Sequence, residues 1–75
     1  MIDDGAAALK MFGERVRSAR AGSGLSQESM AQRCGVHRTY YSAVERGERN
    51  VGLLNLFKIA RGLAVDPGQL VGGLV

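Results

Sequence analysis

The sequence has a single cysteine, a single histidine and a single proline. One cysteine excludes an intramolecular disulfide and any zinc finger, and a lone histidine is a poor metal ligand. These residues and the scattered acids supply no nucleophile with a base, no carboxylate pair and no phosphate-binding loop. We therefore expect neither an enzyme nor a bound metal or cofactor. No apolar run approaches the roughly 18 residues of a membrane span, and the acidic N-terminus is unlike a signal peptide, so we expect a cytoplasmic protein.

Glycine, by contrast, is abundant, with eleven copies among 75 residues, and no stretch shows strand-like alternation. This composition predicts one all-α domain over residues 1–75, with short helices separated by glycine turns. The formal net charge is +3, and the segment from Lys10 to Arg61 contains ten Lys and Arg but only four Glu. Eight of the ten cations are Arg, which favours planar recognition of phosphate and guanine. This charge distribution suits a polyanionic partner.

The first predicted helix has apolar residues at helical spacing: Leu9, Phe12, Val16 and Ala19. We expect residues 1–8 to form a frayed N-terminal extension or an early helical turn that Asp3 or Asp4 caps. Gly22 and Gly24 are expected to end the helix.

The chain is organised around residues 27–46, which read QESMAQRCGVHRTYYSAVER. Ser26 is predicted to cap a helix whose inward residues are Met30 and Ala31. Gly35 can adopt the positive φ that a sharp turn between two helices needs. The stretch therefore predicts a helix, a tight turn and a second helix that crosses the first.

The second helix of this stretch, over residues 37–46, has two faces. The apolar residues just before and along it are predicted to face back onto the preceding helix: Val36, Tyr41 and Val44. Its other side chains form a polar and cationic outer face: His37, Arg38, Thr39, Ser42, Ala43 and Arg46. This is the pattern of a DNA-reading helix-turn-helix. Cys34, just before the turn, is expected to be a small, half-buried apolar residue.

The last third of the chain predicts two more helices. The fourth helix has apolar residues at spacings of three and four: Leu53, Leu56, Phe57, Ala60 and Leu63. Asp66 as N-cap and Pro67 at the first helical position begin a fifth helix over residues 66–75. Apolar residues run along much of this fifth helix: Leu70, Val71, Leu74 and Val75. The predicted fold is a compact bundle of five short helices.

With these residues in place, the chain resembles the phage repressor/Cro-like (XRE-type) helix-turn-helix domains. The resemblance covers Phe12 to about Leu70, through GERVRSAR, GLSQESMA, GVHRTYYSAVERG and LxxLxxIAxxLxVDP. Within the family, GVxRTYYSxxERGxRN is most similar to the controller proteins of restriction-modification systems, which are small dimeric regulators. Two positions depart from the family pattern. His37 replaces a small polar residue and is a poor cap, and the pair Val51-Gly52 weakens the expected cap of the fourth helix.

The resemblance implies a repressor-like fold that binds double-stranded DNA, with base-reading residues on the third helix. Arg38 can donate two hydrogen bonds to guanine O6 and N7 in the major groove. Thr39 can contact a thymine methyl or a base edge, and His37 can contact a base or a phosphate. Ser42 and Ala43 have short side chains, which would let the helix sit deep in the major groove.

The expected phosphate contacts flank that face: Gln27, Tyr40, Arg46, Arg49 and Asn50. Gln27, at a helix N-terminus, matches the family position that contacts phosphate and braces the recognition helix. The resemblance also implies an internal ion pair between Arg20 and Glu45, so we expect neither residue to contact DNA.

One recognition helix touches only a few base pairs, so selective binding needs two half-sites roughly 34 Å apart. We therefore expect a homodimer on a palindromic operator, with Val71, Leu74 and Val75 at the interface. These residues could instead simply close the core. A phage-type repressor, the antitoxin of a toxin–antitoxin pair and an interaction module that does not bind DNA remain open. No small-molecule ligand is evident.

Overall fold

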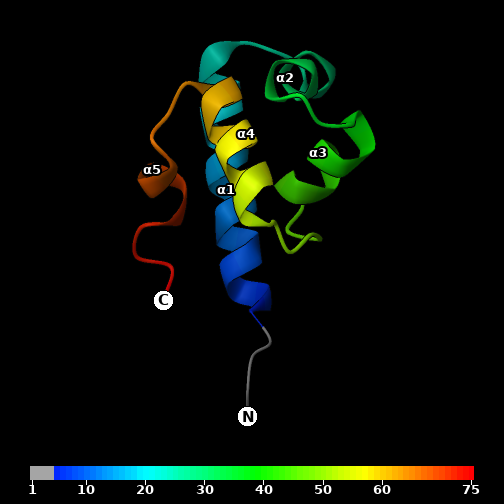
Figure 1. Cartoon of the computed structure of the whole chain (residues 1–75). Helices are drawn as coiled ribbons and strands as arrows, with labels where there is room; N and C mark the ends of the chain where they lie inside the picture. Colours follow the sequence, from blue (N-terminus) through cyan, green and yellow to red (C-terminus); the bar gives the residue numbers. More distant parts are fainter. Residues whose placement is uncertain (1–4) are drawn as a thin grey trace.

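The computed structural model describes residues 5–75 and contains five α-helices in that range (Figure 1). They are α1 (Ala6–Ser23), α2 (Gln27–Cys34), α3 (Arg38–Glu45), α4 (Leu53–Leu63) and α5 (Pro67–Val71). In the view of Figure 1, α2 and α3 lie on one side of α1 and α4, and α5 lies on the other. The predicted all-α, five-helix fold is confirmed. None of the described helices is long and apolar enough to cross a bilayer.

Helix α1 is longer than its sequence pattern indicates. It begins at Ala6, so residues 6–8 are helical rather than part of a frayed extension. The predicted caps Asp3 and Asp4 lie outside the described residues. Gly22 does not end the helix, which continues to Ser23 and closes on Gly24 at a φ of +76°. A glycine at an exposed helical position lowers stability without breaking the hydrogen-bonded ladder.

The buried core takes residues from all five helices: Phe12, Val16, Met30, Ala31, Cys34, Tyr41, Val44, Ile59, Ala60, Leu63 and Leu70. Most predicted inward positions of α1, α2 and α3 are thus confirmed, whereas Leu9, Ala19 and Val36 are only partly buried. Burial raises the pKa of the Cys34 thiol to about 11, so this side chain stays protonated and packs as an apolar group.

Glycines at two helix crossings allow the bundle to close. A Cβ placed on Gly13 of α1 would lie 2.5 Å from the carbonyl oxygen of Val44 in α3. A Cβ on Gly62 of α4 would overlap the Cys34 side chain of α2. The small residues therefore set the distance between α1 and α3 and between α2 and α4, which positions α3 on the bundle.

Helix α4 is apolar on two faces, and the prediction assigned its inward face only in part. Ile59, Ala60 and Leu63 are buried and Leu56 is partly buried, whereas Leu53 and Phe57 point outward, with exposed fractions of 63% and 44%. The 3–4 spacing places these residues near the edge of the apolar stripe, and packing against α1 and α2 decides which of them are covered.

The fifth helix is shorter than predicted. Asp66 caps it, as expected, and Gln69 completes a capping box, but the helix ends at Val71, so Leu74 and Val75 lie in the tail beyond it. Gly72 and Gly73 interrupt the helix, and Arg15 of α1 holds the end of the chain. The Arg15 Nη1 donates to the carbonyl oxygens of Leu70 (3.3 Å) and Gly72 (2.7 Å).

Candidate nucleic-acid interface

The α2–turn–α3 unit is built by local hydrogen bonds. The N–H of Ser29 donates to the Ser26 hydroxyl at 3.0 Å, which caps α2 as predicted. Gly35 ends α2 at a φ of +73°, and the N–H of Val36 donates to the Ala31 carbonyl. This arrangement closes the helix C-terminus and turns the chain sharply into α3.

His37 caps the N-terminus of α3. Its Nδ1 accepts a hydrogen bond from the N–H of Thr39 at 3.3 Å, so the expectation that His37 is a poor cap is wrong. The neutral imidazole is required, because Nδ1 accepts only when it carries no proton. Since the side chain is exposed, Nε2 is left for a base or phosphate.

Most of the predicted DNA-contacting residues lie on the accessible side of α3 and in the loop that follows. The exposed ones are His37, Arg38, Thr39, Arg46, Arg49 and Asn50, while Tyr40 and Ser42 are partly buried. Ala43 is different, with an exposed fraction of 4%, so the prediction that it lies on the outer face is wrong. Helices α1 and α2 both pack on α3, so more of this short helix is covered than its sequence pattern indicates.

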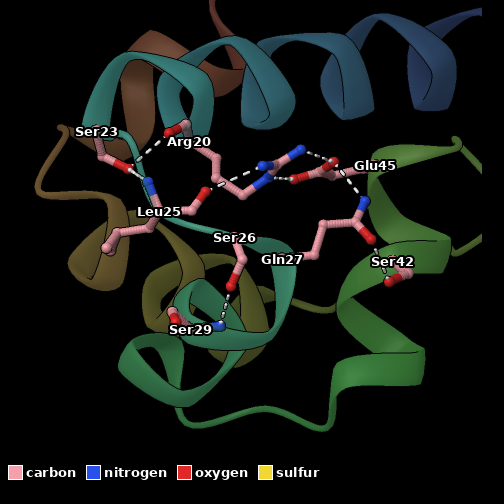
Figure 2. A network of polar contacts seen from close by, with 8 residues as sticks. All are labelled: Arg20, Ser23, Leu25, Ser26, Gln27, Ser29, Ser42 and Glu45. Carbon is pink, nitrogen blue, oxygen red and sulfur yellow. Dashed lines mark hydrogen bonds and ion pairs between the residues drawn. The ribbon is translucent and has the colours of Figure 1, made fainter.

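A polar network joins α1, α2 and α3 behind this face (Figure 2). The Arg20 guanidinium donates from Nε to Glu45 Oε2 (2.6 Å) and from Nη2 to Glu45 Oε1 (3.1 Å), so the expected ion pair is present. A third Arg20 bond reaches the Leu25 carbonyl (3.1 Å). Arg20 thereby ties the end of α3 to α1 and to the loop before α2.

Gln27 continues this network toward the outer face. Its Nε2 donates to Glu45 Oε1 (2.8 Å), and its Oε1 accepts from the Ser42 hydroxyl (2.9 Å) (Figure 2). Burial would raise the pKa of the Glu45 carboxyl, but the hydrogen bonds from Arg20 and Gln27 outweigh it and hold the pKa below its ordinary value. Glu45 is therefore a charged, acceptor-only centre. Gln27 thus braces α3, and one of its N–H groups is left for a phosphate.

Three contacts near the interface carry no signal in the sequence pattern. Asn55 Nδ2 of α4 donates to the Tyr40 hydroxyl at 3.2 Å, which leaves the Tyr40 proton free for a phosphate. Arg46 pairs with Glu48 at 3.2 Å across the surface, and this hydrogen bond lowers the pKa of Glu48. Arg33 Nε donates to the Gly62 carbonyl (3.1 Å) and so satisfies a carbonyl at the end of α4. The bonds of Asn55 to Tyr40 and of Arg33 to Gly62 join residues far apart in the chain, so they appear only once the helices are packed.

The described residues hold no cluster of His, Cys, Asp or Glu suited to a metal. They form a short capped helix, α3, which crosses α2 after a positive-φ turn. Arginines lie on its accessible side. This arrangement defines a helix-turn-helix DNA-binding domain.

The chain belongs to the XRE-type helix-turn-helix family, whose model matches residues 16–70. The control protein C.BamHI of Bacillus amyloliquefaciens is 48% identical over 62 residues, which cover 81% of this chain and 76% of that protein. The control protein C.MunI of Mycoplasma sp is 45% identical over 60 residues, which cover 79% of this chain and 81% of that protein.

The solved structures agree with this assignment. The restriction-modification controller protein C.AhdI from Aeromonas hydrophila is similar to this chain with a TM-score of 0.85 and 46% identity, over 91% of this chain and 99% of that one. The chain is therefore a DNA-binding transcription regulator of the controller-protein type, and its family is one of regulators rather than enzymes.

Proposed function

We propose that this protein is the homodimeric controller of a restriction-modification system, acting in the cytoplasm on a palindromic operator at its own promoter. The observation that carries the proposal is the accessible side of α3, where Arg38 and Thr39 are exposed one turn before Ser42. An exposed arginine at the start of a recognition helix can read guanine, and the flanking Arg46 and Arg49 can grip phosphates without reading sequence.

An exposed apolar surface supports the homodimer. It is formed by Leu53, Leu54 and Phe57 on the outer face of α4, with exposed fractions of 63%, 74% and 44%, and by Val71 and Val75. Residues 50–57 contain no charged side chain, so two copies of a chain with net charge +3 can meet there without direct repulsion. We call this set the α4 surface. It includes two residues of the predicted interface.

Leu74, the third residue of the predicted interface, lines an apolar groove beside the α4 surface. The groove has a volume of about 150 Å³, and Leu9, Phe12, Val51 and Leu56 also line it. Leu74 is partly buried and packs against the core, so it contributes mainly to closing the fold. The α4 residues take its place in the proposed interface.

The relatives support the restriction-modification assignment over a phage repressor or an antitoxin, since C.BamHI and C.MunI are control proteins and C.AhdI is a restriction-modification controller. An interaction module that does not bind DNA has no support from the exposed arginines of α3 and of the loop that follows it: Arg38, Arg46 and Arg49. The genes beside the reading frame provide an independent check. A restriction endonuclease or methyltransferase is expected there, rather than a toxin or phage genes.

The experiment is footprinting on the DNA upstream of the gene, with wild type, Arg38→Ala and Arg61→Ala at several salt concentrations. Arg61 lies in the last turn of α4, so Arg61→Ala removes the same charge away from α3. We expect a symmetric footprint, affinity that falls steeply with salt, and loss of the footprint in Arg38→Ala alone. Equally weak binding of all three proteins to every sequence would overturn the proposal and favour an interaction module.

A further inference from the structure

The hydrogen bonds behind α3 form a chain whose direction the chemistry of its members sets (Figure 2). Arg20 is a donor only, and the Glu45 carboxylate that it faces is an acceptor only. Gln27 also faces Glu45, and an amide oxygen placed against a carboxylate would be repelled. The Gln27 amide must therefore turn its nitrogen to Glu45 and its oxygen away.

This orientation decides what the Ser42 hydroxyl does. Its oxygen lies 2.9 Å from Gln27 Oε1, which has no proton, so Ser42 donates in that hydrogen bond. A hydroxyl has one proton and two lone pairs. With the proton engaged inside the protein, Ser42 can only accept a hydrogen bond from any group outside it.

Ser42 lies on the side of α3 that is expected to read bases. It is one helical turn after Arg38 and three residues after Thr39, so the three side chains lie along one side of α3. In the major groove the bases that present a hydrogen-bond donor are adenine, through N6, and cytosine, through N4. Thymine O4 and guanine O6 and N7 are acceptors, and an acceptor facing the oxygen of Ser42 would be left unpaired and repelled.

We propose that Ser42 is a specificity-determining residue whose oxygen, oriented by Gln27, selects an amino-bearing base, adenine or cytosine, on the strand that it faces. Arg20 and Glu45 act through Gln27 as positioning residues. The inference rests on the proposed DNA binding and adds the class of base that one position of the operator must hold.

The test is selection of binding sites from randomised duplex DNA with purified wild type, Ser42→Ala, Gln27→Leu and Arg38→Ala. In wild type, we expect one position in each half-site to favour adenine or cytosine about three- to tenfold, which is the contribution of a single hydrogen bond. Ser42→Ala should lose that preference and keep the others. Arg38→Ala, the control, should lose a preference for guanine at a different position.

Gln27→Leu separates this role from a phosphate contact. It removes the acceptor of the Ser42 proton, so the hydroxyl can rotate and donate to thymine or guanine, and the preference for adenine and cytosine should disappear. Loss of a phosphate contact alone would weaken binding uniformly across sequences and leave the preference intact. Circular dichroism checks the fold of each variant. If Gln27→Leu does not fold, Gln27→Met, with an unbranched side chain of similar length, replaces it.

The outcomes distinguish this inference from the proposed function. The inference is overturned if Ser42→Ala changes no position, if the position that it changes favours guanine or thymine, or if the folded Gln27 variant keeps the wild-type preference. In each of these cases wild type still selects a palindromic site, so the proposed function stands. Failure of wild type to enrich any sequence would instead overturn both.

Discussion

Arg20 and Glu45 join α1 to the last residue of α3 through two parallel hydrogen bonds of 2.6 and 3.1 Å. The Glu45 side chain is 3% exposed, so its charge has little contact with water and depends on Arg20 and Gln27. A buried ion pair of this kind is costly to break from one side, because the remaining charge stays buried without a partner. The pair therefore locks the recognition helix to the bundle more than it adds net stability.

This pair makes folding sensitive to acid. Glu45 has a pKa below the ordinary 4.5 in the folded protein, so the unfolded chain takes up its proton at a higher pH than the folded one. The stabilisation is therefore complete above about pH 5 and declines as pH falls through the folded pKa. We expect Glu45→Gln to lose about 3 kcal/mol at pH 7 and to show a weaker loss of stability on acidification than wild type. Urea unfolding at several pH values measures both, and parallel pH profiles would contradict the prediction.

The crossing of α1 and α3 predicts opposite effects at two glycines of one helix. A Cβ on Gly13 would lie 2.5 and 2.6 Å from the carbonyl oxygens of Val44 and Glu45, whereas nothing lies within 4 Å of one on Gly22. We expect Gly13→Ala to destabilise the fold by about 1–3 kcal/mol, because backbone must move. Gly22→Ala should stabilise it by up to about 1 kcal/mol through helix propensity. Thermal unfolding followed by circular dichroism compares them, and stabilisation by both substitutions would mean that α1 and α3 are further apart.

Local signals in the sequence were enough to predict much of this fold. Ser26, Gly35 and the pair Asp66-Pro67 each mark a helix boundary through their own backbone or side-chain chemistry, and the structure places a boundary at each. The ends of α1 and α5 were predicted less well, because glycines at 22, 72 and 73 are compatible with more than one end point.

The sequence predicts helix boundaries more reliably than it predicts which residues lie on the buried and exposed faces of each helix. Ala43 is small and α3 is only eight residues long, so periodicity does not show whether α1 and α2 cover that position. Leu53 and Phe57 match a helical stripe equally well whether they point inward or outward. The bonds of Gln27 to Ser42 and of Asn55 to Tyr40 join residues 15 positions apart, and only the packed bundle brings them together.

Glu48 is expected to restrain DNA binding. Glu48 forms a surface ion pair with Arg46, so Arg46 must break this pair before it can bind a phosphate. The negative charge of Glu48 also repels the DNA backbone. We expect Glu48→Gln to raise operator affinity several-fold at low salt, and the gain should shrink at high salt. Asp66→Asn, at the start of α5, changes net charge equally, keeps a capping side chain and is the control. Electrophoretic mobility shifts measure both, and equal gains would show that only net charge matters.

Asn55 is expected to support the proposed phosphate contact of Tyr40. Because Asn55 donates to the Tyr40 hydroxyl, that hydroxyl keeps its own proton for the DNA. Tyr40→Phe and Asn55→Ala should each lower affinity about three- to tenfold, and the double variant should lose no more than Tyr40→Phe alone. The salt dependence should not change, since no charge is removed, whereas Arg49→Ala should reduce its slope by about one. Additive losses in the double variant would mean that the two residues act separately.

The α4 surface predicts where an added charge would break the proposed dimer. Leu54 is 74% exposed, so Leu54→Asp leaves the core untouched but buries a carboxylate if two copies meet on this surface. We expect the variant to stay folded as a monomer, with an unchanged unfolding temperature. It should sediment as a monomer where wild type is a dimer, and it should lose cooperative binding to two half-sites. Ser18→Asp, exposed on α1, adds the same charge elsewhere and should remain dimeric. If Leu54→Asp stays dimeric while Val75→Asp dissociates, the interface lies at the C-terminal tail, and Leu53, Leu54 and Phe57 are not part of it.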